Sequence, residues 1–357
     1  MDGYYAWMLV ATALVLLMTT PALALFYGGM SRSKSVLNMM MMSYISMAVV
    51  GIVYVLWGWS MSFADGFSGD GQILPDKPFD LFGLDGVTSE NYIYVLFQLT
   101  FAVITAALIS GAIADRVKLS AWIVFLPLWV TLSYFPLAHM VFGGGLIGGE
   151  IGAQDYAGGT AVHINAGVAG LVLALIIGKR VGFGREPMKP HNLTLTMLGA
   201  GLLWFGWYGF NVGSIVFSSD SLGDPDLFQA QFFSETGRTF MNTTVATMAA
   251  LLGWLLIERL LHGKATTLGA ASGIVAGLVA ITPACGAVDI TGAIAIGAIA
   301  GALCAWAVGL KYKFGLDDSL DVVGVHLVGG IVGTLLIGFF SVSDGAAGVE
   351  GLFHGGG

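Results

Sequence analysis

The stretch from residue 155 to residue 180, DYAGGTAVHINAGVAGLVLALIIGKR, most constrains the fold of this chain. It carries no acidic or basic charge between Asp155 and Lys179. A helix that crosses a bilayer needs about 20 mostly apolar residues, so this stretch is long enough to span a membrane. His163 lies inside the run, and an ionisable residue within a membrane segment indicates a functional site.

The same pattern occurs again near the end of the chain. VHLVGGIVGTLL, which starts at Val325, aligns without gaps with VHINAGVAGLVL, which starts at Val162, so that the histidines and two later glycines coincide. His163 and His326 are 163 positions apart, about half the chain. Many transporters build a midplane site from such internal repeats. A single buried histidine is more often a core residue, but two at equivalent positions favour function.

The composition places the chain in a membrane. It is 56% hydrophobic and 10% charged, whereas a soluble domain has about 25% charged residues. No basic segment with a cleavage site precedes the first apolar run, so we expect that run to be retained as a helix. The sequence predicts an all-α polytopic membrane protein with ten spans. These are residues 4–27, 36–63, 91–113, 120–142, 159–178, 194–217, 239–261, 267–284, 290–310 and 322–342.

The distribution of charge predicts how the spans are oriented. The loops after spans one, three, five, seven and nine contain 12 of the 14 basic residues. The positive-inside rule then puts the N-terminus outside. Spans five and ten would run in opposite directions, as a five-plus-five inverted repeat of residues 1–180 and 181–357 requires. The opposite face is acidic, which serves solubility and attracts cations only weakly, since salt screens exposed charge.

Motifs for other functions are absent from the sequence. Gly178-Lys179-Arg180 lacks the remaining residues of a phosphate-binding loop. The other histidines have no metal-ligand spacing, and two cysteines make neither a disulfide framework nor a metal cluster. Basic residues are confined to short loops, which indicates topology and not nucleic-acid binding. We therefore expect no enzyme activity, no metal and no cofactor.

Aromatic and small polar residues gather near the predicted outer ends of the helices. Phe101 and Phe142 belong to spans three and four, and Trp207, Phe210 and Ser214 belong to the GWYGFNVGS segment of span six. Aromatic faces attract a cation by about 0.5–2 kcal/mol, depending on desolvation. A hydroxyl can accept a hydrogen bond from an ammonium-like donor. Each residue alone would be an interface aromatic or core filler, but together with the histidines they predict an aromatic mouth above an apolar passage.

Four segments carry a resemblance to a known family. AGGTAVHINAG, ALFYGG, GFNVGS and DVVGVH resemble the ammonium transporter, methylammonium permease and Rhesus family, and most closely its bacterial ammonium-transporter branch. The resemblance covers residues 4–342. It implies a homotrimer in the plasma membrane, with one pore per protomer, ammonium or methylammonium as substrate, and eleven helices. The eleventh helix is then expected beyond residue 357.

The resemblance also implies roles for particular residues. His163 and His326 would be the paired pore histidines, and Phe101 and Phe210 the stacked gate. The outer ammonium site would comprise Phe142, Ser214, Trp207 and Asp155.

Two of these positions need comment. The family usually has a tryptophan where this chain has Phe142, a weaker cation–π partner, which predicts weaker recruitment of the cation. Asp155 precedes span five, and we expect it to cap the N-terminus of that span rather than contact the cation directly.

Alternatives remain at this point. The leading interpretation is a transporter that deprotonates ammonium and conducts ammonia, with net charge movement. The second is an ammonium sensor that signals through a C-terminal cytoplasmic region. A short tail would favour regulation by a PII-type signal protein, whereas a fused signalling domain would favour the sensor. An electroneutral ammonia channel lies close to the first interpretation.

Overall fold

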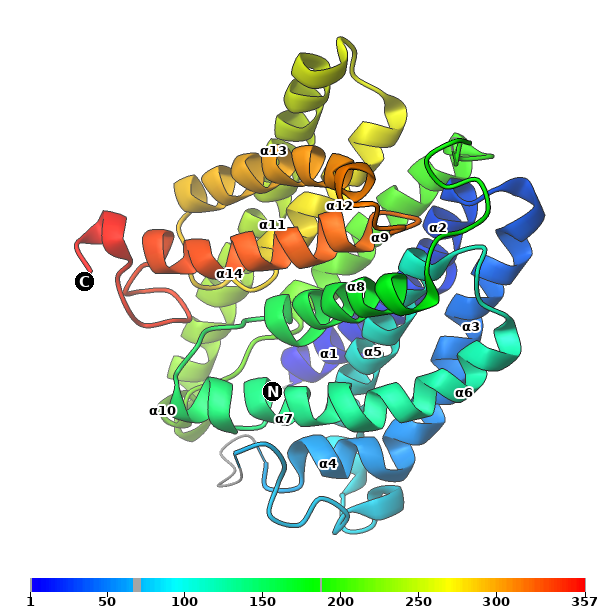
Figure 1. The fold of residues 1–357 in the computed structure, drawn as a ribbon. Helices are drawn as coiled ribbons and strands as arrows, with labels where there is room; N and C mark the ends of the chain where they lie inside the picture. Colours follow the sequence, from blue (N-terminus) through cyan, green and yellow to red (C-terminus); the bar gives the residue numbers. More distant parts are fainter. Residues whose placement is uncertain (1, 67–71, 187, 357) are drawn as a thin grey trace.

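The chain folds into an all-helical bundle in the computed structural model, which describes residues 2–66, 72–186 and 188–356 (Figure 1). Within those residues, nine helical segments are long and apolar enough to cross a membrane. They are Gly3–Met30, Ser33–Phe63, Ser89–Ile113, Leu119–Glu150, Gly159–Ile177, Leu193–Val212, Pro225–His262, Ile290–Phe314 and Val323–Phe340. The prediction of an all-α polytopic membrane protein is confirmed.

Several of these segments are composite. The first joins α1 to α2 through a turn in which Thr20 has non-helical backbone angles, whereas the second and fourth are interrupted by π-helical turns at Tyr54–Gly58 and Val130–Tyr134. The α-helices of the first half are α1 (Asp2–Leu17), α2 (Ala24–Met30), α3 (Val36–Val53), α4 (Trp59–Phe63), α5 (Tyr92–Ile109), α6 (Leu119–Trp129), α7 (Phe135–Phe142) and α8 (Asn165–Ile177). Those of the second half are α9 (Leu193–Val212), α10 (Ser219–Gly223), α11 (Pro225–His262), α12 (Thr267–Ile281), α13 (Ile290–Phe314) and α14 (Val328–Phe340).

Three predicted spans have different lengths in the structure. The sixth ends at Val212 instead of residue 217, and the eighth is the 15-residue helix α12, shorter than a full crossing. The seventh begins at Pro225 and not at residue 239, because Asp224 caps the helix by accepting hydrogen bonds from the next turn. The polar composition of residues 225–238 concealed this extension from a search for apolar runs. We call these residues the α11 extension.

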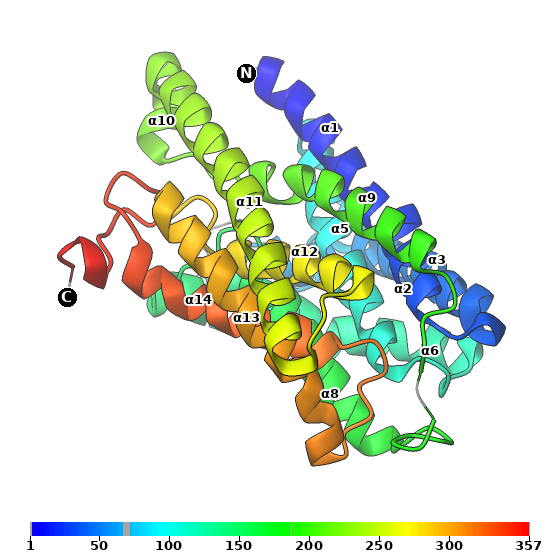
Figure 2. The same cartoon turned by 90° about the horizontal axis from the view of Figure 1, so that it is seen from above.

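The α11 extension projects beyond the rest of the bundle, beside the start of α1 (Figure 2). Helix α11 has 38 residues, which corresponds to about 57 Å at 1.5 Å per residue. The hydrocarbon core of a bilayer is only about 30 Å thick. Part of α11 therefore lies outside the apolar layer, and the charged and polar side chains of the extension indicate that it is this part.

Helices α8 and α14 run in opposite directions (Figure 1), and each packs against the turn that precedes the other, residues 323–327 for α8 and 159–164 for α14. Their contacts run in reverse order along the two chains. An added Cβ at Gly167 would lie 2.6 Å from the backbone nitrogen of Leu327, and one at Gly330 would lie 3.0 Å from Ile164. Such close approach needs glycine on both helices. The antiparallel crossing brings the two histidine-containing segments together.

Candidate functional site: a histidine cavity and a vestibule

Both histidines lie in π-helical turns that lead into the crossing helices. His163 belongs to η9 (Gly159–Ile164), directly before α8, and His326 belongs to η10 (Val323–Leu327), directly before α14. A π-helical turn inside a longer helix is rare and is frequent at functional sites. The two imidazole rings lie nearly parallel, with centroids 5.3 Å apart. Their Nδ1 atoms are 3.2 Å apart, within hydrogen-bonding distance.

The Nδ1–Nδ1 contact determines what the pair can offer to a small molecule. A neutral imidazole carries one proton, on either Nδ1 or Nε2. The ring that donates from Nδ1 has a bare Nε2, and its partner has a protonated Nε2. The neutral pair therefore presents one acceptor and one donor. Nε2 of His163 has no hydrogen-bond partner among the described residues although it is buried, and a buried polar atom normally has one.

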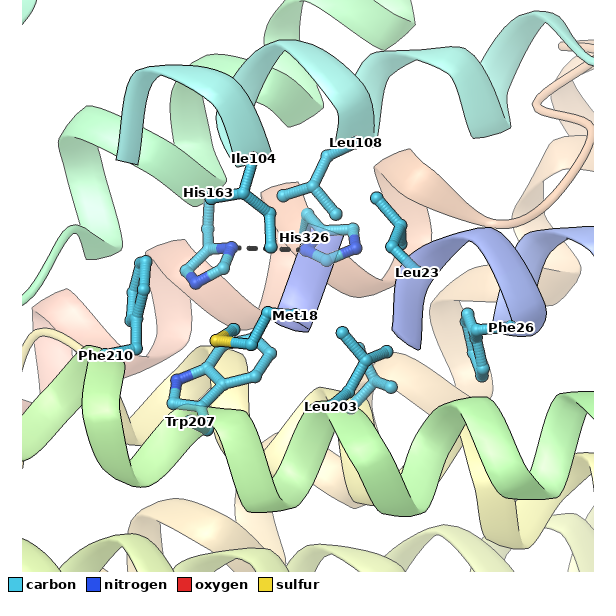
Figure 3. Close-up of a pocket in the computed structure, with 11 residues that line it drawn as sticks. Met18, Leu23, Phe26, Ile104, Leu108, His163, Leu203, Trp207, Phe210 and His326 are labelled. Atoms are coloured by element: carbon cyan, nitrogen blue, oxygen red, sulfur yellow. Dashed lines mark hydrogen bonds between the residues drawn. The ribbon is translucent and has the colours of Figure 1, made fainter. Parts of the chain in front are cut away.

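A small cavity lies against the histidine pair (Figure 3). Its volume is ≈ 10 Å³, about the space that one water-sized molecule needs. Apart from the two imidazoles, every side chain of its wall is apolar or aromatic. These side chains are Met18, Leu23, Phe26, Ile104, Leu108, Leu203, Trp207, Phe210 and Val275. The cavity therefore favours a small neutral guest over an ion.

Phe101 and Phe210 stack face to face next to the histidine pair. Their ring centroids are 4.1 Å apart with an interplanar angle of 9°, and both rings are buried. Phe210 also lies against His163, with ring centroids 6.2 Å apart. The stacked rings lie between the histidine cavity and a second, wider cavity. The sequence predicted this pair as a stacked gate; the rings stack, and the gating role stays a prediction.

The wider cavity, which we call the vestibule, has a volume of ≈ 650 Å³ and is open to the surface. Phe142, Ser214 and Asp155 line it. The Phe142 ring meets Phe101 edge-on, with centroids 6.5 Å apart, and the Ser214 hydroxyl donates to the Phe210 carbonyl at 2.8 Å. Three of the four residues predicted for the outer site therefore share this cavity.

The fourth predicted residue, Trp207, lies elsewhere. Its ring stacks on His163 with centroids 5.4 Å apart, and its indole N–H donates to the Thr282 hydroxyl at 2.8 Å. It lines the histidine cavity and is not among the residues of the vestibule. Trp207 precedes Phe210 by three residues, almost one turn of α9, so its ring lies on the inner side of the stacked pair.

Asp155 caps the segment that carries His163. Its Oδ1 accepts from the N–H groups of Gly158 and Gly159 at 2.8 and 2.6 Å, and its Oδ2 accepts from Thr160 and Ala161 at 2.8 and 3.1 Å. Burial raises the pKa of Asp155 above its ordinary value, although these four bonds act in the opposite direction. The geometry fits a structural cap, because both carboxylate oxygens are occupied by backbone.

Asp318 caps the segment that carries His326, and the sequence analysis did not identify it. Asp318 accepts hydrogen bonds from the N–H groups of Val322 and Val323 at 3.0 and 2.7 Å. Burial, followed by the charge of Asp321, raises the pKa of Asp318 to about 6. Each aspartate lies eight residues before its histidine. That equal spacing was the signal in the sequence that could have identified Asp318.

The end of the bundle near Asp318 carries a buried network of charges. Arg180 pairs with Asp317 at 3.1 Å, and Lys311 pairs with Asp321 at 2.6 Å. Arg116 donates to the carbonyls of Gly178 and Asp317 at 2.5 Å each. Burial lowers the pKa of the Arg116 guanidinium, and the nearby Asp317 charge opposes that shift. This network ties three loops together.

The fold and the site define a class of protein: a polytopic membrane protein with a small, mostly apolar cavity at two buried histidines, separated by stacked aromatic rings from a wide vestibule. The chain belongs to the Ammonium Transporter Family, whose sequence pattern matches residues 6–357. An ammonium transporter of Mycobacterium tuberculosis is 53% identical over 392 residues, covering 99% of this chain and 78% of that protein. An ammonium transporter of Aquifex aeolicus is 48% identical, with 99% and 80% covered.

Solved structures agree with this assignment. Mep2 of Saccharomyces cerevisiae superposes with a TM-score of 0.83 at 34% identity, covering 97% of this chain and 78% of that chain. A structure described as a sensor Amt protein superposes with a TM-score of 0.84 at 27% identity, covering 96% and 84%. The family and the apolar helices identify a multi-pass plasma-membrane protein.

Proposed function

We propose that this chain transports ammonium by binding it at the vestibule, removing one proton and conducting ammonia past the two histidines. The observation that carries the proposal is the buried, unpaired Nε2 of His163 beside a cavity with room for one small molecule. In this reading the histidine pair supplies one donor and one acceptor, and ammonia both donates and accepts.

The magnitudes favour ammonia over ammonium inside the passage. Moving a bare ammonium ion into an apolar interior costs tens of kcal/mol by Born solvation. Two or three aromatic faces return about 0.5–2 kcal/mol each. Deprotonation costs about 3 kcal/mol, because ammonium titrates about two units above neutral pH and each unit is 1.36 kcal/mol. A potassium ion has no proton to release, so the same passage rejects it.

Each predicted site residue takes a role in this scheme. The cation binds outside against Phe142, with the Ser214 hydroxyl as an acceptor, and the stacked rings of Phe101 and Phe210 gate the way inward. His163 and His326 hold ammonia. Asp155 supports the site by fixing the turn before His163. Trp207 belongs to the wall of the histidine cavity, beside the imidazole on which it stacks.

The architecture is part of the same proposal. The antiparallel crossing of α8 and α14 supports an inverted repeat of residues 1–180 and 181–357. We also propose a homotrimer with net charge movement, which requires that the proton removed from ammonium crosses the membrane as well as the ammonia. Regulation at the cytoplasmic face would come from a PII-type signal protein or a fused signalling domain. These proposals rest on the family resemblance.

A sensor is the second candidate function. The structural similarity to a protein described as a sensor Amt protein favours it, as does Phe142, which is a weaker cation partner than tryptophan. In that case ammonium would bind at the vestibule without rapid transfer.

The test is an ammonium pulse applied to reconstituted protein on a solid-supported membrane, with His163→Ala and His326→Ala beside the wild type. A transient wild-type current that the histidine changes reduce supports electrogenic transport. Tight ammonium binding without current or uptake supports the sensor. Uptake without current supports an electroneutral ammonia channel and refutes net charge movement.

A further inference from the structure

The α11 extension has two chemically different faces. Phe228 and Phe232, four residues apart, pack around Tyr4 of α1 with ring centroids 5.9 and 6.0 Å from it. Tyr4 is buried, so this contact fixes the extension on the bundle. Residues three and four apart are neighbours on a helix surface, and a second set of this spacing adjoins the aromatic pair. That set is Gln231, Ser234, Glu235 and Arg238, and all four line the vestibule.

The charged side chains of the vestibule wall differ in their hydrogen-bond and ion-pair partners. Among its described residues are three carboxylates, on Asp155, Glu235 and Asp344, and one guanidinium, on Arg238. Asp155 is occupied by four backbone N–H groups. Asp344 pairs with Arg238 at 2.5 Å. Among the described residues, Glu235 accepts a side-chain hydrogen bond from Gln231 and has no ion-pair partner, so it is the least engaged of the three carboxylates.

Neutral donors hold the Glu235 carboxylate in place. The Gln231 amide donates to its Oε2 at 2.9 Å, and Tyr156 is a second neutral neighbour in the wall of the vestibule. Burial, with a smaller contribution from the Glu235 charge, raises the pKa of Tyr156 well above its ordinary value, so its hydroxyl stays protonated. The remaining charged neighbour is Arg238, whose charge Asp344 offsets. The Glu235 carboxylate is therefore oriented by Gln231 and has no direct ion pair among the described residues.

We propose that Glu235 is a second cation-recruiting residue of the vestibule, which attracts ammonium or methylammonium toward Phe142 and offsets the weak aromatic partner there. The inference rests on the proposed function. A carboxylate in a cleft with low-dielectric walls raises the local concentration of cations more than the same charge on an open surface does. A carboxylate on α11 thereby attracts the cation, as a tryptophan at position 142 on α7 would.

The experiment measures methylammonium uptake by reconstituted protein at low ionic strength. Glu235→Gln should raise the half-saturation concentration about two- to fivefold, the range expected for a partly exposed charge pair, with the maximal rate unchanged. Asp226→Asn is the matched control, because Asp226 is an exposed acid on the same extension that does not line the vestibule. High salt should remove most of the difference.

A further pair of variants separates recruitment from folding. Phe142→Trp should restore much of the affinity that Glu235→Gln loses. Ser234→Glu adds a carboxylate to the same wall at an exposed position and should lower half-saturation. An unchanged half-saturation in Glu235→Gln overturns the proposal, as does an equal change in Asp226→Asn. If Glu235→Gln does not fold, an unchanged Ser234→Glu overturns it.

Failure of the transport proposal can be told apart from failure of this one. If the wild type transports nothing, ammonium binding to the detergent-solubilised protein replaces uptake as the readout. Weaker binding by Glu235→Gln than by the wild type then supports recruitment by Glu235. Equal binding overturns it.

Discussion

The Asp155 cap offers a direct test of how the site is positioned. Asp155→Asn keeps the size of the side chain but replaces one acceptor oxygen by an amide that can only donate. Of the four N–H groups that the carboxylate accepts, two would then face a donor. A buried N–H that loses its acceptor costs about 1–3 kcal/mol, so the turn would lose about 2–6 kcal/mol.

That loss should act on His163, which follows the capped turn within η9. We expect the ammonium-evoked current to fall by at least about tenfold, since 1.36 kcal/mol already corresponds to a factor of ten in rate. Oligomer assembly, read by size-exclusion chromatography, should persist. Asp289→Asn is the control, because Asp289 caps α13 with one bond to Gly292 away from both cavities. A wild-type current in folded Asp155→Asn would refute this reasoning, and loss of folded protein would make Asp155 a folding residue.

Three further predictions follow from single contacts. Phe142→Trp should lower the half-saturation for methylammonium uptake, because tryptophan is the better cation–π partner; an unchanged value would contradict the role of this ring. Gly167→Ala should destabilise the protein by about 1–3 kcal/mol through overpacking against Leu327, measured as a lower thermal midpoint, whereas Gly201→Ala, with nothing within 4 Å, should not. Asp318 has a pKa raised from 3.8 to about 6, so its contribution to stability is present below pH 3.8 and is lost as the pH rises through about 6. Between pH 3.8 and about 6, the thermal midpoint of the wild type should fall relative to that of Asp318→Asn. A difference between the two midpoints that does not change with pH would refute the raised pKa of Asp318.

Apolar length and charge predicted most of the fold because each span must satisfy a physical constraint of the bilayer. The exceptions have local causes. The α11 extension is polar, and its helix is specified by the Asp224 cap and by aromatic packing on Tyr4. Helix α12 has 15 residues because it ends in a buried turn near Thr282, which hydropathy does not register.

The site was predictable where it is polar and unpredictable where it is apolar. The histidines stood out because an imidazole is rare in a membrane segment, and the repeat paired them. The aliphatic wall left no signal, since residues such as Leu23 and Leu203 resemble every other apolar side chain of the spans. Trp207 was assigned to the correct segment but to the wrong side of the stacked rings, because residue type does not specify which way a side chain faces on a helix.

The two aspartate caps explain why the imidazoles meet at all. Each π-helical turn departs from ordinary helical hydrogen bonding, and its first N–H groups need acceptors outside the helix. Asp155 and Asp318 supply them at the same distance of eight residues from His163 and His326. Because both turns are fixed at their starts and cross through glycine contacts, the 3.2 Å contact between the Nδ1 atoms is set by backbone anchored at two opposite ends of the bundle. A change at either aspartate should therefore alter the geometry of both rings.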